Sequence, residues 1–225
     1  MSKLVWDQIG EKLWETGVDM CVLFPINAQG THENGVAWSG ITAINESPSG
    51  AEPTKIYADN IVYGVVMSPE EDALTIEAFT YPDEYAECIG EAIVGNGGAI
   101  IKQQTHKHFG LAYRTMIGND TEGTNHGYKI HIFWDCVAGA SEDSNSTIND
   151  SPEQKTFSWS VTTLPVAASG FQPTASMVID STKLAEGKLT QIKNLLYGTD
   201  AEGQTAGTES TLPSFDTLKG ILTAA

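Results

Sequence analysis

The sequence has little positive charge. Only 12 of its 225 residues are Lys or Arg, against 29 Asp or Glu, so the net charge is −17, and Arg114 is the single arginine. A protein that grips duplex DNA neutralises phosphates with clustered Lys and Arg. The composition therefore argues against a DNA-gripping surface, although DNA could still pass nearby and be repelled. Acidity that serves solubility alone is an equally good interpretation.

The chain also lacks paired cysteines and long apolar runs. Cys21, Cys88 and Cys136 are far apart and form no CxxC motif, which is typical of reduced, buried thiols in a cytosolic protein. The start of the chain has no apolar leader, and the longest apolar run, 61–67, is too short to cross a bilayer. We therefore expect a soluble protein without a membrane partner.

Motifs for catalysis and cofactor binding are missing as well. There is no GxSxG, P-loop, HExxH or EF-hand sequence. His106 and His108 would share one face of a strand and could hold a metal with a third ligand, and the run 70–72 could supply carboxylates to Ca²⁺ or to a glycosidase. Polar strand positions and an acidic helix start or solvated turn explain these residues more simply. We predict no enzyme, no catalytic or metal site, and no cofactor.

Alternating side chains are the strongest positive signal. In 128–136 every second residue is apolar or aromatic, and 156–164 alternates more cleanly still. A period of two indicates half-buried strands, with 138–154 as a long surface loop between them. In the second strand Phe157, Trp159 and Val161 face a core. Its other face is lined by hydroxyls, from Thr156, Ser158, Ser160 and Thr162.

The remaining patterns predict a mainly β fold with flanking helices, a β-sandwich or barrel-like domain. Further strands are expected at 18–26, 35–45, 56–67, 74–80, 100–117 and 175–179. Helices are expected at 81–90 and at 181–197, the second capped by Ser181 and ended by Gly198. We divide the chain into an N-terminal arm (1–17), the β domain (18–198) and a flexible C-terminal segment (199–225).

Charge is unevenly distributed along the chain. The range 56–101 holds nine acidic residues and no basic one, so the surface that it forms should be strongly electronegative.

Five segments, in this order along the chain, resemble the major tail proteins of tailed bacteriophages, the subunits of the tail tube. They are 57–60, 75–88, 113–120, 149–153 and 162–165. The resemblance implies a structural virion protein of the phage tail, assembled in the host cytoplasm. It also implies hexameric rings that stack into a tube and conduct double-stranded DNA. The implied partners are other copies of the chain and the tape measure, tail terminator and distal tail proteins.

The resemblance also suggests roles for two surfaces. In tail tube proteins an early loop between strands reaches the neighbouring ring, so we predict that the loop 45–55 stacks the rings. Its prolines lower the entropy cost of ordering it. The residues assigned to stacking are Pro48, Ser49, Gly50, Ala51, Glu52 and Pro53. The loop 138–154 is assigned an outer, mobile position, and the hydroxyl face of 156–162 is the candidate lining of the lumen.

Two alternatives from other classes stay open. One is a monomeric ligand-binding or carbohydrate-binding β-sandwich, which would use exposed aromatic residues such as Trp38. The other is a metal hydrolase built on His106 and His108. A tube subunit should assemble, whereas both alternatives should stay small and bind a sugar or a metal.

Overall fold

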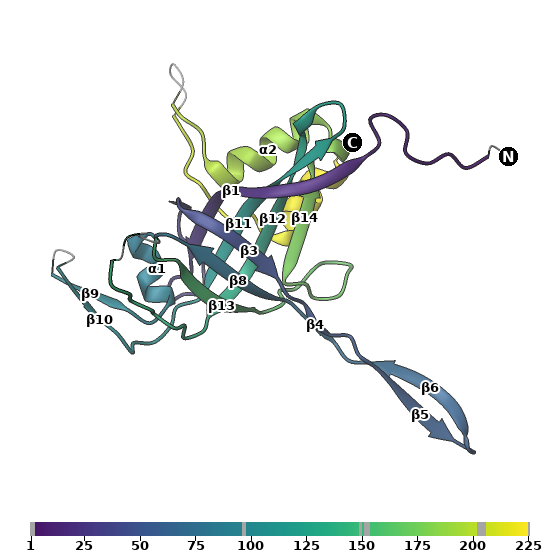
Figure 1. Cartoon of the computed structure of the whole chain (residues 1–225), viewed down its shortest axis with the longest axis horizontal. Coiled ribbons are helices and arrows are strands. Elements are labelled where there is room, and N and C mark those ends of the chain that lie inside the picture. Colours follow the sequence, from purple (N-terminus) through teal and green to yellow (C-terminus); the bar gives the residue numbers. More distant parts are fainter. Residues whose placement is uncertain (1–2, 96–97, 149, 151–153, 202–205, 225) are drawn as a thin grey trace.

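The fold is known from a computed structural model, which describes residues 3–95, 98–148, 150, 154–201 and 206–224. It is mainly β, with 45% strand and 14% helix, as the sequence predicts. One large antiparallel sheet dominates (Figure 1). Its strands follow the order β2 (Val36–Trp38), β1 (Leu13–Pro25), β11 (Phe109–Asn119), β12 (Gly123–Ala138), β13 (Phe157–Thr163), β8 (Ala73–Ala78) and β3 (Ile41–Glu46), and β14 (Ser176–Asp180) pairs with β12.

Three small two-stranded sheets and the helices complete the described chain. The small sheets pair β4 (Ser49–Gly50) with β7 (Glu70–Glu71), β5 (Pro53–Ala58) with β6 (Ile61–Met67), and β9 (Ala92–Val94) with β10 (Ala99–Ile101). The helices are α1 (Asp83–Cys88), a 3-10 turn (Ser181–Lys183), α2 (Glu186–Tyr197) and α3 (Phe215–Thr223).

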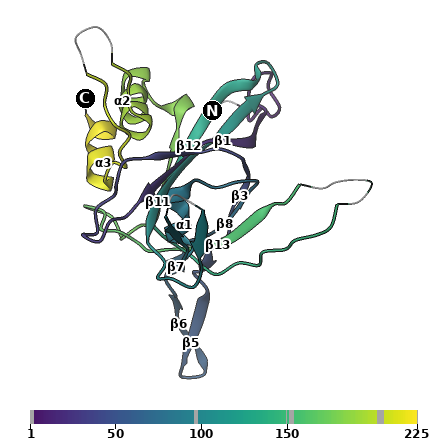
Figure 2. The same ribbon diagram turned by 90° about the vertical axis from the view of Figure 1, so that its left-hand side faces the viewer.

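Two hydrophobic cores lie on opposite faces of β1, β11 and β12. The inner core fills the space between these strands and the β13–β8–β3 layer, and α1 contributes to it; its buried members include Trp38, Ile76, Tyr85, Leu111, Phe133 and Trp159. The outer core lies under α2 and α3, and includes Ile130, Ile132, Trp134, Ile192 and Leu218. Figure 2 shows α2 and α3 together on one side of the sheet. The central strands are therefore buried on both faces, which a simple half-buried pattern does not predict.

A bulge in β12 places Cys136 on the opposite face from the one that the sequence pattern predicts. Phe109 pairs with Cys136, but Leu111 pairs with Phe133, so β12 has an extra residue here. Side chains that alternate up to Trp134 change phase at such an irregularity. Cys136 therefore lies in the inner core, not with Ile130 and Trp134 in the outer one.

Three predicted strands are interrupted. The range 56–67 turns back on itself at Asp59 and Asn60, which both have positive φ (51° and 64°), the conformation of a tight two-residue hairpin turn. The range 35–45 is broken at Gly40 (φ 86°), where β2 ends and β3 begins. In 100–117, the residues from 102 to 108 belong to no strand.

Both predicted helices exist, with one corrected cap. The range 81–90 contains α1, and α2 ends before Gly198 at φ 72°, as expected. Ser181, however, lies in the 3-10 turn, and its Oγ accepts a hydrogen bond from the backbone N–H of Tyr128. Ala185 is the residue at the N-cap of α2.

The ends of the chain differ from their predicted boundaries. Strand β1 already begins at Leu13, inside the expected arm 1–17. The expected flexible segment 199–225 instead contains α3, whose Phe215 and Leu218 are buried in the outer core. Residues 202–205 and 225, in the same segment, lie outside the described part. Within the described ranges no helix has the length and apolar character needed to cross a membrane.

Candidate assembly interface

The most prominent feature outside the body is a long hairpin arm, residues 47–72, formed by β4, β5, β6 and β7. Figure 1 shows it projecting from the end of β3 and β8. Its root is continuous with the main sheet, because Ser47 N donates to the carbonyl of Ala73. The arm therefore extends the sheet rather than standing on a separate domain.

The predicted stacking loop 45–55 consists of strand segments joined by short turns. Asn45 belongs to β3, Ser49 and Gly50 to β4, and Pro53 to β5, so the loop is the first leg of the arm. Its partner leg is 65–71: Ser49 pairs with Glu71, Gly50 with Glu70, and Lys55 with Val65. The run 70–72, expected as a helix start or solvated turn, thus provides strand β7.

The two ladders of the arm meet at a kink that needs glycine. Gly50 has φ 83° and Ala51 has φ 50°, both in the left-handed region. A Cβ on Gly50 would lie 2.3 Å from the carbonyl oxygen of Pro69. Ser68 closes the kink, because its Oγ accepts the N–H of Glu52. A larger residue at position 50 would redirect the arm.

The outer half of the arm displays apolar side chains. Eight large hydrophobic residues of β5 and β6 are between 46% and 75% exposed: Ile56, Tyr57, Ile61, Val62, Tyr63, Val65, Val66 and Met67. Adjacent positions in one strand point to opposite faces, so both faces of the ribbon are apolar. A contiguous exposed apolar surface of this kind marks an interaction site.

A second surface is the outer face of β13, β8 and β3. Ser158, Ser160 and Thr162 are exposed there, and Thr156 is exposed just before β13. The apolar residues that alternate with them face the inner core, as predicted. Ser158 pairs with Glu77 and Ser160 with Thr75 on β8, so hydroxyls and one carboxylate continue across the sheet. The predicted hydroxyl face exists as an exposed sheet surface.

A polar cluster joins the root of the arm to the central strands. Glu46, the last residue of β3, accepts hydrogen bonds from the hydroxyl of Tyr113 and from Nδ1 of His131 (2.8 Å). The His131 ring stacks on Tyr113 at 4.6 Å, and its Nε2 lies 3.1 Å from Thr115 Oγ1. The His131 hydrogen bond lowers the pKa of the Glu46 carboxyl, against the effect of burial. The cluster fixes β3 where it leaves the body.

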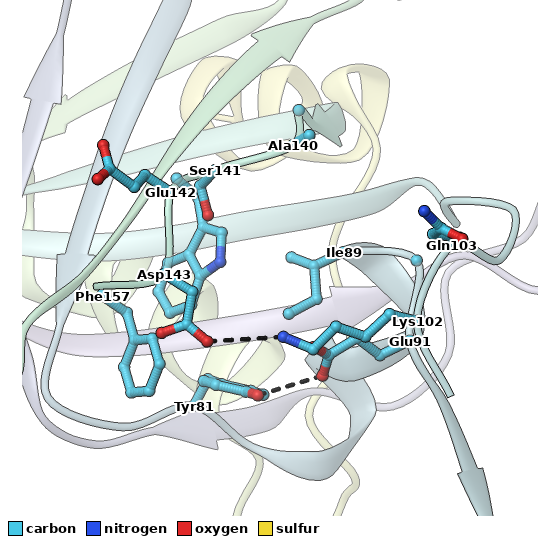
Figure 3. Close-up of a pocket in the computed structure, with 13 residues that line it drawn as sticks. Tyr81, Ile89, Glu91, Lys102, Gln103, Ala140, Ser141, Glu142, Asp143 and Phe157 are labelled. Atoms are coloured by element: carbon cyan, nitrogen blue, oxygen red, sulfur yellow. Dashed lines mark hydrogen bonds and ion pairs between the residues drawn. The ribbon is translucent and has the colours of Figure 1, made fainter. Parts of the chain in front are cut away.

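The start of the loop after β12 is held by charged groups (Figure 3). Lys102 bridges Glu91 (3.4 Å) and Asp143 (3.6 Å), and Tyr81 donates a 3.2 Å hydrogen bond to Glu91. Burial, followed by the charge of Glu91, raises the pKa of Tyr81 to about 12. These groups line a small cavity of about 150 Å³. The expected mobile loop 138–154 is therefore anchored at Asp143; its residues 149 and 151–153 lie outside the described part.

The residues that motivated the alternative functions are engaged within the fold. Nδ1 of His106 lies 2.7 Å from the carbonyl oxygen of Ala138, and Nδ1 of His108 lies 2.6 Å from Asp135 Oδ1. Neither histidine lies in a strand. Trp38 is only 3% exposed, and its Nε1 donates to the carbonyl of Thr80. Trp38 therefore cannot serve as an exposed platform for a sugar ring.

The sequence patterns did not single out the apolar residues of the hairpin arm as a candidate contact surface. A signal was present, because Asp59 and Asn60 are turn-forming residues between two β-prone runs.

Comparison with known proteins does not identify a family for this chain. No protein-family model matches it, and no curated protein matches it at a significant level.

Proposed function

We propose that this chain is a structural subunit of a phage tail tube, which assembles into hexameric rings that stack into a conduit for DNA. The observation that carries the proposal is the hairpin arm. The order of the tail-protein-like segments along the chain supports it, although residues 149 and 151–153 of these segments lie outside the described part. The proposed location is the virion tail, with the tape measure, tail terminator and distal tail proteins as further partners.

The arm supports assembly on physical grounds. An isolated two-stranded hairpin is at best marginally stable in water, and three or more strands or a packed face are needed for independent stability. The arm shows β5 pairing only with β6 among the described residues, and both faces are apolar. Contact with a neighbouring subunit would bury these faces and stabilise the ribbon. We assign ring stacking to the whole arm, including its first leg with Pro48 and Pro53.

The outer face of β13, β8 and β3 suits a channel wall. Ser158, Ser160 and Thr162 offer small hydroxyls, and Glu77 adds a negative charge beside them. A net charge of −17 repels phosphates, whereas clustered lysines would retain DNA in a salt-dependent manner. We therefore assign this face to the lumen. A tube map with rings of unpaired lysines along the bore would contradict the assignment.

The test is electron microscopy of the purified chain over rising concentration and after seeding with pre-formed tube ends. Rings and stacked tubes are the expected result. In one variant a short Gly-Ser turn replaces residues 51–68, which removes the outer arm but keeps the β4–β7 root. This variant should form rings without tubes.

The matched control replaces residues 144–154 of the other long loop with a similar Gly-Ser connection and keeps Asp143. It should still form tubes. A parent chain that stays monomeric under all conditions would refute the proposed function. If only the control loses tubes, stacking belongs to the other loop.

A further inference from the structure

We infer that the N-terminal extension of one copy, residues 3–9, docks in an apolar groove beside β14 and α3 of a second copy, with Leu4 and Trp6 inserted. The inference rests on the proposed function, because it needs neighbouring copies. It concerns a contact separate from the hairpin arm.

The N-terminal extension is an apolar segment that leaves the body. Leu4, Val5, Trp6 and Ile9 are between 64% and 86% exposed. Among the described residues the segment is held at its root, where Gly10 N donates to Asp120 Oδ1 (2.9 Å) in the turn between β11 and β12. Figure 1 shows it running away from the sheet. Four large apolar side chains held in water need a partner surface.

The groove offers such a surface. It has a volume of about 690 Å³ and lies between the start of β14 and α3. Its lining residues include Phe171, Pro173, Met177, Phe215 and Leu222. Phe171 is 69% exposed and packs edge-on against Phe215 with ring centroids 5.9 Å apart. A volume of this size falls in the range of sites that bury several large groups.

The edge of β14 can pair with the docked segment as an added strand. Strand β14 pairs with β12 on one side, and no strand pairs with its other side within the part of the chain that the structure describes. Such an edge accepts an extended segment through backbone hydrogen bonds, with alternate side chains entering pockets. Met177 lies opposite Ile132 and so points to the outer-core face, where the groove is. In an extended segment Leu4 and Trp6 share a face, and both can enter the groove.

Charge favours the same arrangement. Lys219 lines the groove, where its Nζ lies 5.2 Å from the centroid of the Phe171 ring. Asp7 follows Trp6 directly and is exposed. Asp7 has φ 57°, so the extended run ends at Trp6 and the Asp7 carboxylate can approach Lys219 at the rim of the groove. Cationic side chains are scarce in this protein, which has 12 Lys or Arg against 29 Asp or Glu.

The chain's own groove is out of reach. The root at Gly10 lies beside the β11–β12 turn, where Asn119 pairs with Gly123, whereas Met177 pairs with Ile132. The same pairs are seven residues apart along β11, from Asn119 to Ala112 (119 − 112), roughly 23 Å at the rise of a strand. Trp6 is four residues from Gly10 (10 − 6), at most about 14 Å of extended chain. The N-terminal extension can therefore reach this groove only in a second copy.

The test is disulfide cross-linking between two full-length variants mixed before assembly. One carries Leu4→Cys, at a position that enters the groove in the proposed docking while Trp6 is kept as the second anchor, and the other carries Gln172→Cys in the groove. The native thiols interfere little, because Cys21, Cys88 and Cys136 are buried and burial raises the pKa of Cys88 to about 12. Covalent dimers should form in the mixture, at least tenfold above either variant alone. A control mixture with Ser158→Cys in place of Gln172→Cys should remain at background.

The outcomes separate this inference from the proposed function. Tubes without cross-links would overturn the docking and leave the tube intact. Cross-linked chains without rings or tubes would support the docking and refute the tube. A double variant, Leu4→Cys with Gln172→Cys, should give chains linked in series. A link closed within one chain would overturn the inference.

Discussion

Strand β12 of the body and strand β6 of the hairpin arm are built from the same kinds of residue, but their environments are opposite. Ile130 and Ile132 in β12 are 0% exposed, whereas Ile61 in β6 is 65% exposed. The body covers both faces of β12, with a layer of strands on one face and helices on the other. The arm has no such layer among the described residues. Apolar alternation therefore predicts a strand in both places, but it does not say which molecule covers the strand.

The comparison has an energetic side. Burial of apolar surface contributes about 25 cal/mol per Å². In the body this contribution stabilises the single chain. In the arm the same kind of surface is still exposed, so its contribution is available to assembly. Substitutions in the two regions should therefore separate stability from assembly.

The largest effect on the free chain is expected in the inner core. Ile76 in β8 is 0% exposed, so Ile76→Ala removes buried methylene groups and leaves a cavity. We expect a loss of about 2–5 kcal/mol in the free energy of unfolding. Urea denaturation followed by circular dichroism measures it. A loss below about 1 kcal/mol would show that the inner core is not packed as described.

A smaller, pH-dependent effect on the free energy of unfolding is expected at the junction of body and arm. Hydrogen bonding to His131 lowers the pKa of Glu46 below 4.5, so the folded state binds this proton less readily than the unfolded state. The stabilisation is therefore present above pH 4.5 and is lost as the pH falls through the lowered value. Glu46→Gln should cost about 1 kcal/mol at neutral pH, since Glu46 is partly exposed, and should weaken the loss of stability in acid.

Acid titration of unfolding measures the effect at Glu46. Glu186→Gln is the matched control, because that side chain is 82% exposed. Parallel acid profiles for the parent chain and Glu46→Gln would contradict the role given to the cluster.

A third substitution should stabilise the body slightly. The hydroxyl of Tyr85 is buried in the inner core without a hydrogen-bond partner among the described residues. An unpaired buried hydroxyl is costly, so Tyr85→Phe should raise the free energy of unfolding by about 1 kcal/mol. Tyr113→Phe is the matched control with the opposite sign, because the Tyr113 hydroxyl donates to Glu46. A destabilised Tyr85→Phe variant would mean that this hydroxyl has a partner.

Local sequence patterns predicted much of the fold. The alternation in 156–164 identified β13 with the correct inner and outer faces, and the Pro and acidic start of 81–90 identified α1. These features depend on neighbouring residues along the chain. The bulge that moves Cys136 to the inner core depends on the pairing of β11 with β12, which no local pattern records.

The secondary structure of the candidate interface was predicted less well for the same reason. The sequence placed the stacking contact within 45–55, where Pro48 and Pro53 restrict the chain. The structure shows that this range pairs with 65–75 through β3, β4 and β5, so the element is a hairpin arm rather than a loop. The long-range pairing, not the composition, decides that residues 56–67 are displayed to solvent. The hydroxyl face was found because it depends only on alternation.

The smallest effect on the free energy of unfolding is expected for a substitution in the arm. The same substitution gives the sharpest test of the difference between body and arm. Ile61→Ser changes a residue that is 65% exposed, so unfolding of the free chain should change by no more than about 0.5 kcal/mol. If the arm is an interface, the same variant should lose stacked tubes while it keeps rings. Sedimentation of assemblies, followed by negative-stain microscopy, measures this loss.

Ile148→Ser provides the matched control, because Ile148 is 88% exposed in the other long loop. The same change from Ile to Ser then acts on two exposed isoleucines, one in the arm and one outside it. Exposure alone predicts the same outcome for both variants. A partner on the arm predicts that only Ile61→Ser fails to form tubes, because a buried serine there gains no apolar contact and must also lose its water. If both variants assemble normally, Ile61 is not part of the ring-to-ring contact.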